Sequence, residues 1–356
     1  MEGIAPDNPI GTDGFEFVEF TAPSEHGIGQ LRELFMAMGF TETARHRSKN
    51  VFLFQQNGIN FVLNGSPSGP ARDFAERHGP SACAMAFRVR NAAQAAAYAE
   101  ARGAKLLGSH ANFGELNIPC LEGIGGSLLY LVDRYGERSI YDVDFDFIPG
   151  RTAADHAVGL MAIDHLTHNV ERGQMDVWAS FYERIAGFRE IRYFDIEGRH
   201  TGLLSRAMTA PCGKIRIPIN EPADERSQIA EFIRDYRGEG IQHIALASDD
   251  IYATVSRLRA NGVAFMATPD TYYEKVDARV PGHGESLEQL RELNILIDGA
   301  PGREGILLQI FTRALIGPIF FEIIQRKGNQ GFGEGNFRAL FESIEEDQIR
   351  RGVIEA

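Results

Sequence analysis

Hydrophobic and polar positions follow two alternating patterns, which together repeat one plan four times along the chain. A short run rich in β-branched and aromatic residues precedes a segment with apolar residues three and four positions apart, then a glycine and further apolar runs. These glycines are Gly39, Gly103, Gly187 and Gly262. Because glycine adopts the left-handed conformation readily, each is expected to end a helix. The pattern predicts an α+β chain of four modules, each a strand, a helix and several strands.

The expected helices have apolar faces, and the runs between them have the composition of sheet strands. Trp178, Phe181 and Ile185 share one face of the helix before Gly187. Asp249 or Asp250 is expected to cap the helix before Gly262. The expected strands include residues 14–20, 86–89, 127–132, 214–219 and 305–311. We expect the modules to pair, with their sheets curled around a cavity.

A polar segment at residues 149–155 separates two modules from the other two. The chain has 356 residues and is 44% hydrophobic, which is long enough for two hydrophobic cores. We therefore expect an N-terminal pair of modules at residues 1–154. This pair is expected to be non-catalytic, because its strands near Ala84 and Leu129 lack the candidate ligands of the second half. The C-terminal pair, at residues 155–356, is expected to carry the site and a terminal helix.

The charge balance argues against some classes of partner, and the cysteines argue against two kinds of structural site. There are 49 acidic and 36 basic residues, and the net charge of −13 works against nucleic acid or an anionic membrane as the main partner. The three cysteines, Cys83, Cys120 and Cys212, are widely spaced and suggest neither a disulfide framework nor a thiolate zinc site. With no leader-like or membrane-spanning run, we expect a cytoplasmic protein.

Three residues on separate strand-like runs form a candidate metal site. His165 and His243 each follow an isoleucine and a polar residue at the start of the third and fourth modules, and Glu322 lies in the apolar run at 319–324. Two histidines and one carboxylate are the ligands of a facial iron(II) site. They leave the ion with a charge of +1 and about three open positions, which suits an anionic chelating substrate and dioxygen.

Each of these residues also has a structural interpretation. A lone histidine on a strand is more often a hydrogen-bonded structural residue, and Glu322 could pair with Arg326 or face solvent from an edge strand. His168 is three residues from His165, and this odd offset predicts that it faces the other side of the strand. In the N-terminal half, Ala84 stands where His243 is expected, since each lies 19 residues before its glycine. The remaining histidines are expected to be solvated: His26, His46, His78, His110, His156, His200 and His283.

A glycine-rich segment follows Glu322 and leads into the expected terminal helix. Four glycines between residues 328 and 335 form a loop that can approach a ligand closely, and Asn336 is expected to cap the helix. Phe332 and Phe337 could clamp an aromatic ring while the helix closes the cavity, or the helix could simply dock on the core. Polar strand residues that could orient a phenol or a carboxylate are Ser205, Asn220, Gln242 and Gln309.

These segments resemble the 4-hydroxyphenylpyruvate dioxygenase family, in its bacterial form, over nearly the whole chain. The main motifs are IDHLTHNV (163–170), GIQHIAL (240–246), LLQIFT (307–312), FFEIIQRKG (320–328) and GFGEGNF (331–337). The resemblance implies the vicinal-oxygen-chelate fold, with four βαβββ modules paired into two open barrels and a C-terminal helix over the active site. It implies Fe(II) held by His165, His243 and Glu322, with no separate cosubstrate.

The resemblance also implies a reaction in tyrosine catabolism. 4-Hydroxyphenylpyruvate and O2 would be converted to homogentisate and CO2 by oxidative decarboxylation, ring hydroxylation and side-chain migration. The implied polar residues of the pocket are Ser205, Asn220, Gln242 and Gln309, where Gln242, Gln309 and Asn220 support the iron centre. The implied aromatic lining is Phe311, Phe320, Phe332 and Phe337.

Three other functions stay open from the sequence. 4-Hydroxymandelate synthase would use the same site and substrate but oxidise the benzylic carbon. A non-catalytic protein of the same fold would bind an aromatic ligand without metal, and an extradiol dioxygenase has similar modules and ligands. The resemblance suggests a homotetramer, with a homodimer as the alternative.

Overall fold

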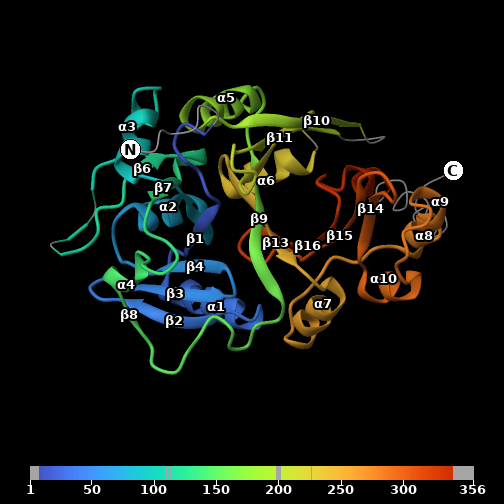
Figure 1. The fold of residues 1–356 in the computed structure, drawn as a ribbon, viewed down its shortest axis with the longest axis horizontal. Helices are drawn as coiled ribbons and strands as arrows, with labels where there is room; N and C mark the ends of the chain where they lie inside the picture. Colours follow the sequence, from blue (N-terminus) through green and yellow to red (C-terminus); the bar gives the residue numbers. More distant parts are fainter. Residues whose placement is uncertain (1–7, 110, 113, 198–201, 226, 340–356) are drawn as a thin grey trace.

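Two eight-stranded sheets, one in each half of the chain, organise the computed structural model (Figure 1). It describes residues 8–109, 111–112, 114–197, 202–225 and 227–339. The strand order in the first sheet is β6-β7-β5-β1-β4-β3-β2-β8. Its strands are β1 (Phe15–Thr21), β2 (Thr41–His46), β3 (Val51–Gln56), β4 (Ile59–Asn64), β5 (Ser81–Arg88), β6 (Cys120–Glu122), β7 (Leu128–Val132) and β8 (Phe145–Phe147).

The second sheet has the order β10-β11-β12-β9-β13-β16-β15-β14. Its strands are β9 (Leu160–Asn169), β10 (Arg189–Glu197), β11 (Gly202–Thr209), β12 (Arg216–Pro222), β13 (Gly240–Ser248), β14 (Leu296–Ala300), β15 (Gly305–Phe311) and β16 (Phe320–Lys327). In both sheets the first strands of the two modules lie side by side and antiparallel, β1 with β5 and β9 with β13. This shared arrangement is the internal repeat that the glycine spacing predicted.

The four predicted helices are present, and each ends near its predicted glycine. They are α1 (Glu25–Ala37), α3 (Ala92–Glu100), α5 (Met175–Ala186) and α7 (Ile251–Ala260). All four glycines have φ between 69° and 88°, the left-handed region that other residues resist. Asp250 caps α7, because its side chain accepts a hydrogen bond from the Ala253 amide. The predicted α+β module plan is therefore confirmed.

Two modules depart from the plan. In the second module, the first strand after the helix is reduced to an isolated bridge between Leu106 and Leu121. The fourth module inserts three short helices before β14. The helices outside the plan are α2 (Pro70–His78), α4 (Tyr141–Asp144), α6 (Gln228–Tyr236), α8 (Asp270–Tyr273), α9 (Val276–Arg279), α10 (Leu287–Leu293) and a 3-10 turn, η1 (Ile124–Gly126).

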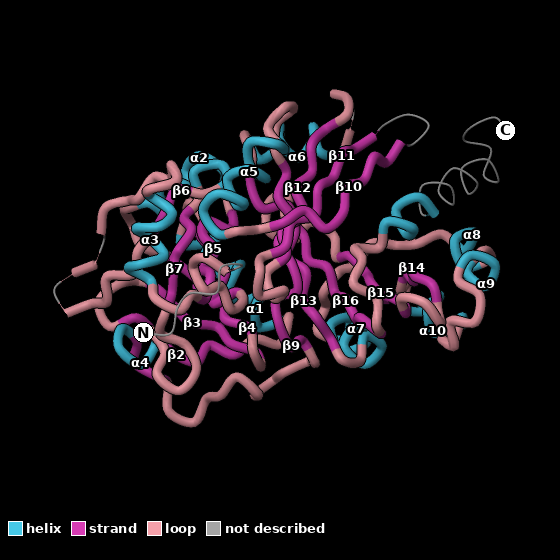
Figure 2. The backbone as a smooth tube through the Cα atoms, turned by 45° about the horizontal axis from the view of Figure 1, so that its top comes forward, coloured by secondary structure: helices cyan, strands magenta, loops and turns pink. Residues whose placement is uncertain are grey.

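The two halves share one hydrophobic core. Phe87 of β5 packs on Phe188, which follows α5, with ring centroids 5.8 Å apart. His78, which was expected to be solvated, is buried here instead, with its Nδ1 2.8 Å from the Tyr236 carbonyl oxygen and its ring stacked on the Tyr236 ring. Phe61 of β4 also lies near Phe321 of β16, with ring centroids 6.1 Å apart. The two halves therefore lie side by side (Figure 2).

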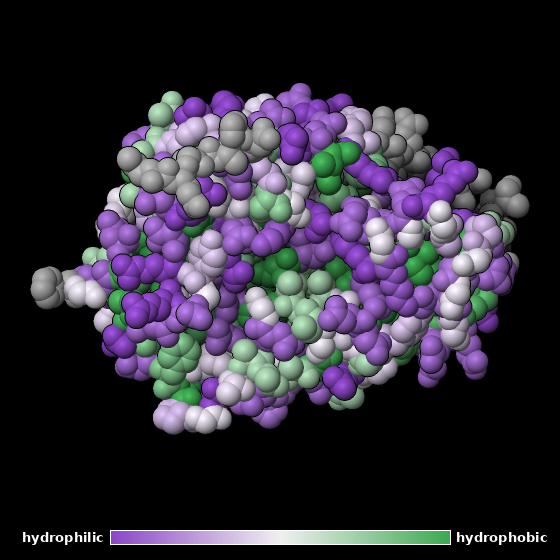
Figure 3. Space-filling model, in the orientation of Figure 1, coloured by the Kyte–Doolittle hydropathy of each residue, from purple (hydrophilic) through white to green (hydrophobic). Residues whose placement is uncertain are grey.

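The surface agrees with the charge balance of the sequence. The face in Figure 3 is largely hydrophilic, with apolar residues showing near its middle, over β9 and β13. Among the described residues, no helix combines the length and the apolar character needed to cross a membrane.

Candidate metal centre

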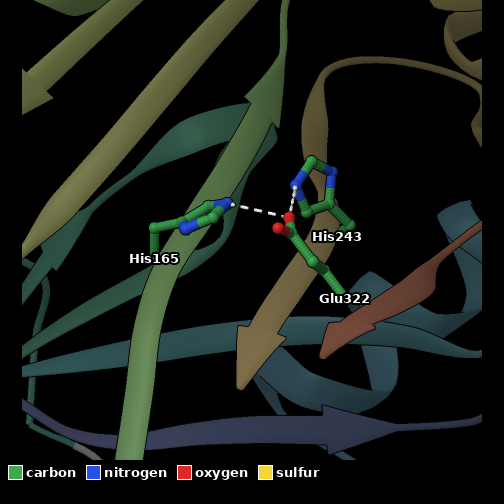
Figure 4. A group of neighbouring side chains, drawn as sticks. All are labelled: His165, His243 and Glu322. Atoms are coloured by element: carbon green, nitrogen blue, oxygen red, sulfur yellow. Dashed lines mark ion pairs between the residues drawn. The ribbon is translucent and has the colours of Figure 1, made fainter. Parts of the chain in front are cut away.

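The three candidate ligands come together on neighbouring strands of the second sheet. His165 of β9 and Glu322 of β16 both pair with Ala245 of β13, and His243 lies two residues before Ala245. Glu322 Oε2 is 3.2 Å from His165 Nε2 and 3.4 Å from His243 Nε2 (Figure 4). One ligand atom from each residue lies within 4.8 Å of the others, which suits a single shared ion.

A β-bulge immediately before each histidine orients its ring. Asp164 is the extra residue on β9 where this strand pairs with β13. Gln242 is the extra residue on β13, three residue pairs further along. A bulge can turn its side chain toward the same face as its neighbour. Asp164 Oδ1 lies 2.8 Å from His165 Nδ1, and Gln242 Oε1 lies 3.0 Å from His243 Nδ1.

These contacts fix the ring nitrogen that faces the site. A carboxylate or carbonyl oxygen can only accept, so each Nδ1 carries a proton and each Nε2 is the nitrogen left to bind a metal ion. Thr167 Oγ1 lies 2.9 Å from His243 Nε2, at the edge of the site. Both Nε2 atoms are therefore placed as a metal ligand requires.

Glu322 is the side chain that most needs a cation. It is 2% exposed, and its Oε1 has no hydrogen-bond partner among the described residues. Burial alone would raise the pKa of Glu322, but without a metal the positive charge of His165 and hydrogen bonds from both imidazoles lower it to about 2, and a metal ion would replace those Nε2 protons. A buried carboxylate with one unpaired oxygen beside two imidazole nitrogens fits a divalent metal ion.

The structural interpretations of these residues do not hold. Arg326 pairs with Asp164 through two hydrogen bonds of 2.8 Å, and not with Glu322. His168 faces away from the three ligands, as its odd offset predicted, and its Nε2 lies 2.8 Å from the Tyr182 hydroxyl. Burial lowers the pKa of His168 to about 3, so it is a neutral core residue.

The ligands open into a cavity of about 540 Å³, the size of a site for a small organic molecule. Each of the eight strands of the second sheet contributes a residue to its lining, so the sheet wraps around the cavity. The lining includes most of the predicted pocket residues: Ser205, Asn220, Gln242, Phe311, Phe320, Phe332 and Phe337.

Gln309 is the predicted pocket residue that does not line the cavity. It is fully buried on β15, and its Oε1 accepts a hydrogen bond from Asn336 Nδ2 at 3.3 Å. A Cβ at Gly333 would collide with the Gln309 amide, so the glycine-rich segment lies directly over it. Gln309 supports that segment in this structure.

The prediction that Asn336 caps the terminal helix was wrong. The described part of that helix spans residues 334–339 and begins two residues earlier. Asn336 Oδ1 instead accepts a hydrogen bond of 2.6 Å from the Tyr272 hydroxyl. In Figure 2 this helical segment lies between β10 and α8. The expected apolar residues Leu340, Phe341 and Ile344 lie outside the described residues.

The N-terminal half lacks an equivalent ligand set. Ala86 of β5 takes the place of Ala245, and it pairs with Phe17 and Tyr130, where the second half has His165 and Glu322. Ala84 is equivalent to His243. Among the described residues, the three ligands are the single group of histidine, cysteine or acidic side chains that could hold a metal.

Comparisons with known proteins agree with this geometry. Residues 6–146 match the family model described as hydroxyphenylpyruvate dioxygenase, N-terminal, and residues 162–276 match the glyoxalase/bleomycin resistance protein/dioxygenase superfamily. The chain is 81% identical to a 4-hydroxyphenylpyruvate dioxygenase of Pseudomonas aeruginosa, over 99% of this chain and 98% of that protein. It is 66% identical to haemolysin VllY of Vibrio vulnificus, over 98% of both chains.

A solved structure is similar as well. It is a mutant of 4-hydroxymandelate synthase from Streptomyces coelicolor, which superimposes with a TM-score of 0.80 at 26% identity, over 95% of this chain and all of the other. The paired, curled sheets are thus those of the glyoxalase superfamily.

Proposed function

The chain belongs to the 4-hydroxyphenylpyruvate dioxygenase family, and we propose that it uses iron(II) to convert 4-hydroxyphenylpyruvate and O2 to homogentisate and CO2. The observation that carries the proposal is the group of His165, His243 and Glu322 at the wall of a largely apolar cavity. The family membership makes the chain a dioxygenase, and the ligand set supports iron as its metal.

Two imidazole nitrogens and one carboxylate oxygen would hold the metal. Iron(II), when bound, would supply a site that chelates the 2-oxo acid and activates dioxygen. The chain's own contribution is to keep both Nε2 lone pairs directed at the ion, through Asp164 and Gln242, and to keep Glu322 ionised.

Aromatic side chains around the ligands would position the substrate ring. Phe332 meets His165 edge-on at 5.3 Å, and Phe320 stacks on His243 at 4.9 Å. Phe311 lies between Phe320 and Phe337, at 5.9 and 6.3 Å. We propose that Phe332 and Phe337 flank the ring, since packing between rings contributes about 1 kcal/mol beyond burial.

Polar residues on the opposite strands would orient the substrate's oxygen atoms. Ser205 of β11 and Asn220 of β12 form a cross-strand pair, and both line the cavity. Gln228, Gln242, Thr268, Asn294, Arg313 and Glu334 also line the cavity. Fixed polar groups of this kind would limit the poses open to a phenol and a keto acid. The terminal helix would exclude water from the cavity during the reaction.

Identifying the product tests the proposal. The protein is loaded anaerobically with Fe(II), supplied with 4-hydroxyphenylpyruvate and O2, and the products are separated. We expect homogentisate and CO2 in equal amounts, each equal to the O2 consumed. A 4-hydroxymandelate product would instead support the synthase reaction of its structural relative, and a lack of O2 uptake would contradict both.

A further inference from the structure

Asp164, the partner of His165, is held in place by two arginines. Arg326 donates to both of its carboxylate oxygens from Nε and Nη2, each at 2.8 Å. Arg216 Nη1 approaches the same carboxylate at 3.5 Å. The three groups are mostly buried, so the carboxylate that orients His165 has a fixed position.

The same two arginines also hold the glycine-rich segment. Arg326 Nη1 donates to the carbonyl oxygens of Asn329 at 3.2 Å and Gly331 at 2.6 Å. Arg216 Nη2 donates to Gln330 Oε1 at 2.8 Å. Three successive residues of the segment are thus tied to the groups that fix Asp164.

Phe332, the next residue of the segment, contacts both His165 and Arg326. Phe332 places its ring edge-on to the His165 ring, and the Arg326 guanidinium carbon lies 5.7 Å from the centre of the Phe332 ring. The contacts therefore form a closed path. It runs from His165 to Asp164 and Arg326, then to the backbone at Gly331, and returns to His165 through the Phe332 ring.

The other histidine has no such connection. Gln242, which orients His243, makes no hydrogen bond to another side chain or to the glycine-rich segment among the described residues, and it lines the cavity. The two histidines are equivalent in the repeat, but His165 alone is tied to the segment that carries Phe332.

We infer that Arg326 is a positioning residue that couples metal binding at His165 to the order of the segment from Gly328 to Gly333. The inference rests on the proposed metal site. Metal binding would fix the orientation of the His165 ring, and the fixed ring would hold the Asp164 carboxylate. Asp164 in turn holds the Arg326 guanidinium, which orders the segment from Gly328 to Gly333. By linkage, an ordered segment raises metal affinity by the same factor.

Hydrogen exchange and metal affinity test this coupling without turnover. Co(II) serves as the probe metal for the chelator-treated full-length protein. In the wild type, Co(II) should slow amide exchange in residues 329–333. In Arg326→Gln, the Co(II) affinity should fall by about 5- to 100-fold, and exchange in the segment should be fast and respond little to Co(II). Arg326→Lys should recover part of both.

Two further variants separate the coupling from a loss of structure. Arg192→Gln is the matched control, because Arg192 pairs with Glu334 and Glu304 beside the segment and does not contact Asp164. It should loosen the start of the helix but leave Co(II) affinity within about twofold of wild type. Asp164→Asn keeps the shape of the side chain and should lose both affinity and coupling, even if Arg326→Gln fails to fold.

The outcomes are distinct. A wild-type segment whose exchange ignores Co(II), or an Arg326→Gln protein with wild-type affinity and a mobile segment, would overturn the coupling and leave the proposed function intact. A wild-type protein that does not bind Co(II) would overturn the metal site itself, and the coupling with it.

Discussion

Replacing His168 by glutamine should make the free energy of unfolding less sensitive to acid. His168 is fully buried, and burial lowers its pKa from the usual 6.5 to about 3. The unfolded chain therefore binds a proton at this residue below pH 6.5, whereas the folded chain stays neutral. Folding stability from this group is fully present above pH 6.5 and is lost as the pH falls toward 3.

The size of the effect follows from these two pKa values. Between pH 7 and pH 5.5, protonation of His168 in the unfolded chain should cost about 1.3 kcal/mol of unfolding free energy. Any folded pKa below about 4 gives the same result, so the prediction needs only the burial of the ring. Glutamine can keep a hydrogen bond to the Tyr182 hydroxyl but does not titrate.

Urea unfolding of the metal-free proteins, followed by the fluorescence of the single tryptophan, Trp178, measures the difference. The wild type should lose about 1.3 kcal/mol more than His168→Gln between the two pH values. The other histidines are common to both proteins and cancel. Equal losses would show that His168 is accessible to protons, which would refute the assignment of opposite strand faces to His165 and His168.

Three other predictions concern the site. Alanine substitutions of the three ligands should abolish Fe(II) binding and activity with the fold retained, whereas His168→Gln should keep bound iron in metal analysis; equal loss in all four would contradict the ligand assignment. Phe337→Ile should leave the metal bound but misplace the ring, so unchanged rates and product ratios would count against the clamp. Arg313, exposed at the cavity, should attract the anionic substrate. At low salt, kcat/KM of Arg313→Gln should be about two- to threefold below that of the wild type. This factor corresponds to about 0.5 kcal/mol of attraction between opposite charges about 8 Å apart in water. Salt at 0.5 M should remove the difference by screening these charges.

Much of the fold was predictable because its signals are local. The left-handed glycines and the apolar periodicity depend on neighbours in sequence, and they correctly gave four modules and their helices. The three ligands could be proposed because a buried carboxylate and two equivalent histidines are unusual in apolar strands. The inserted helices α8, α9 and α10 were missed because each has too few residues to show the helical repeat of apolar positions.

The supporting groups were harder to predict because they depend on register. Gln242 was named among the pocket residues, but Asp164 was missed. Both stand beside a histidine in sequence, and strict alternation would send their side chains to the other face. Only the β-bulges, set by the pairing of β9 with β13, bring them back. Thr167, which contacts His243, has no sequence signal of its own. His78 was misjudged because the Tyr236 that buries it lies 158 residues away.

The central claim is that His165, His243 and Glu322 bind one ferrous ion together with the substrate. An anaerobic titration of metal-free protein with Fe(II), followed by 4-hydroxyphenylpyruvate, tests it most directly. We predict one iron per chain and a visible absorption band when the keto acid is added, with both lost in Glu322→Ala. Iron that binds equally well to Glu322→Ala, or a wild-type protein that takes up no iron and stays colourless, would contradict it.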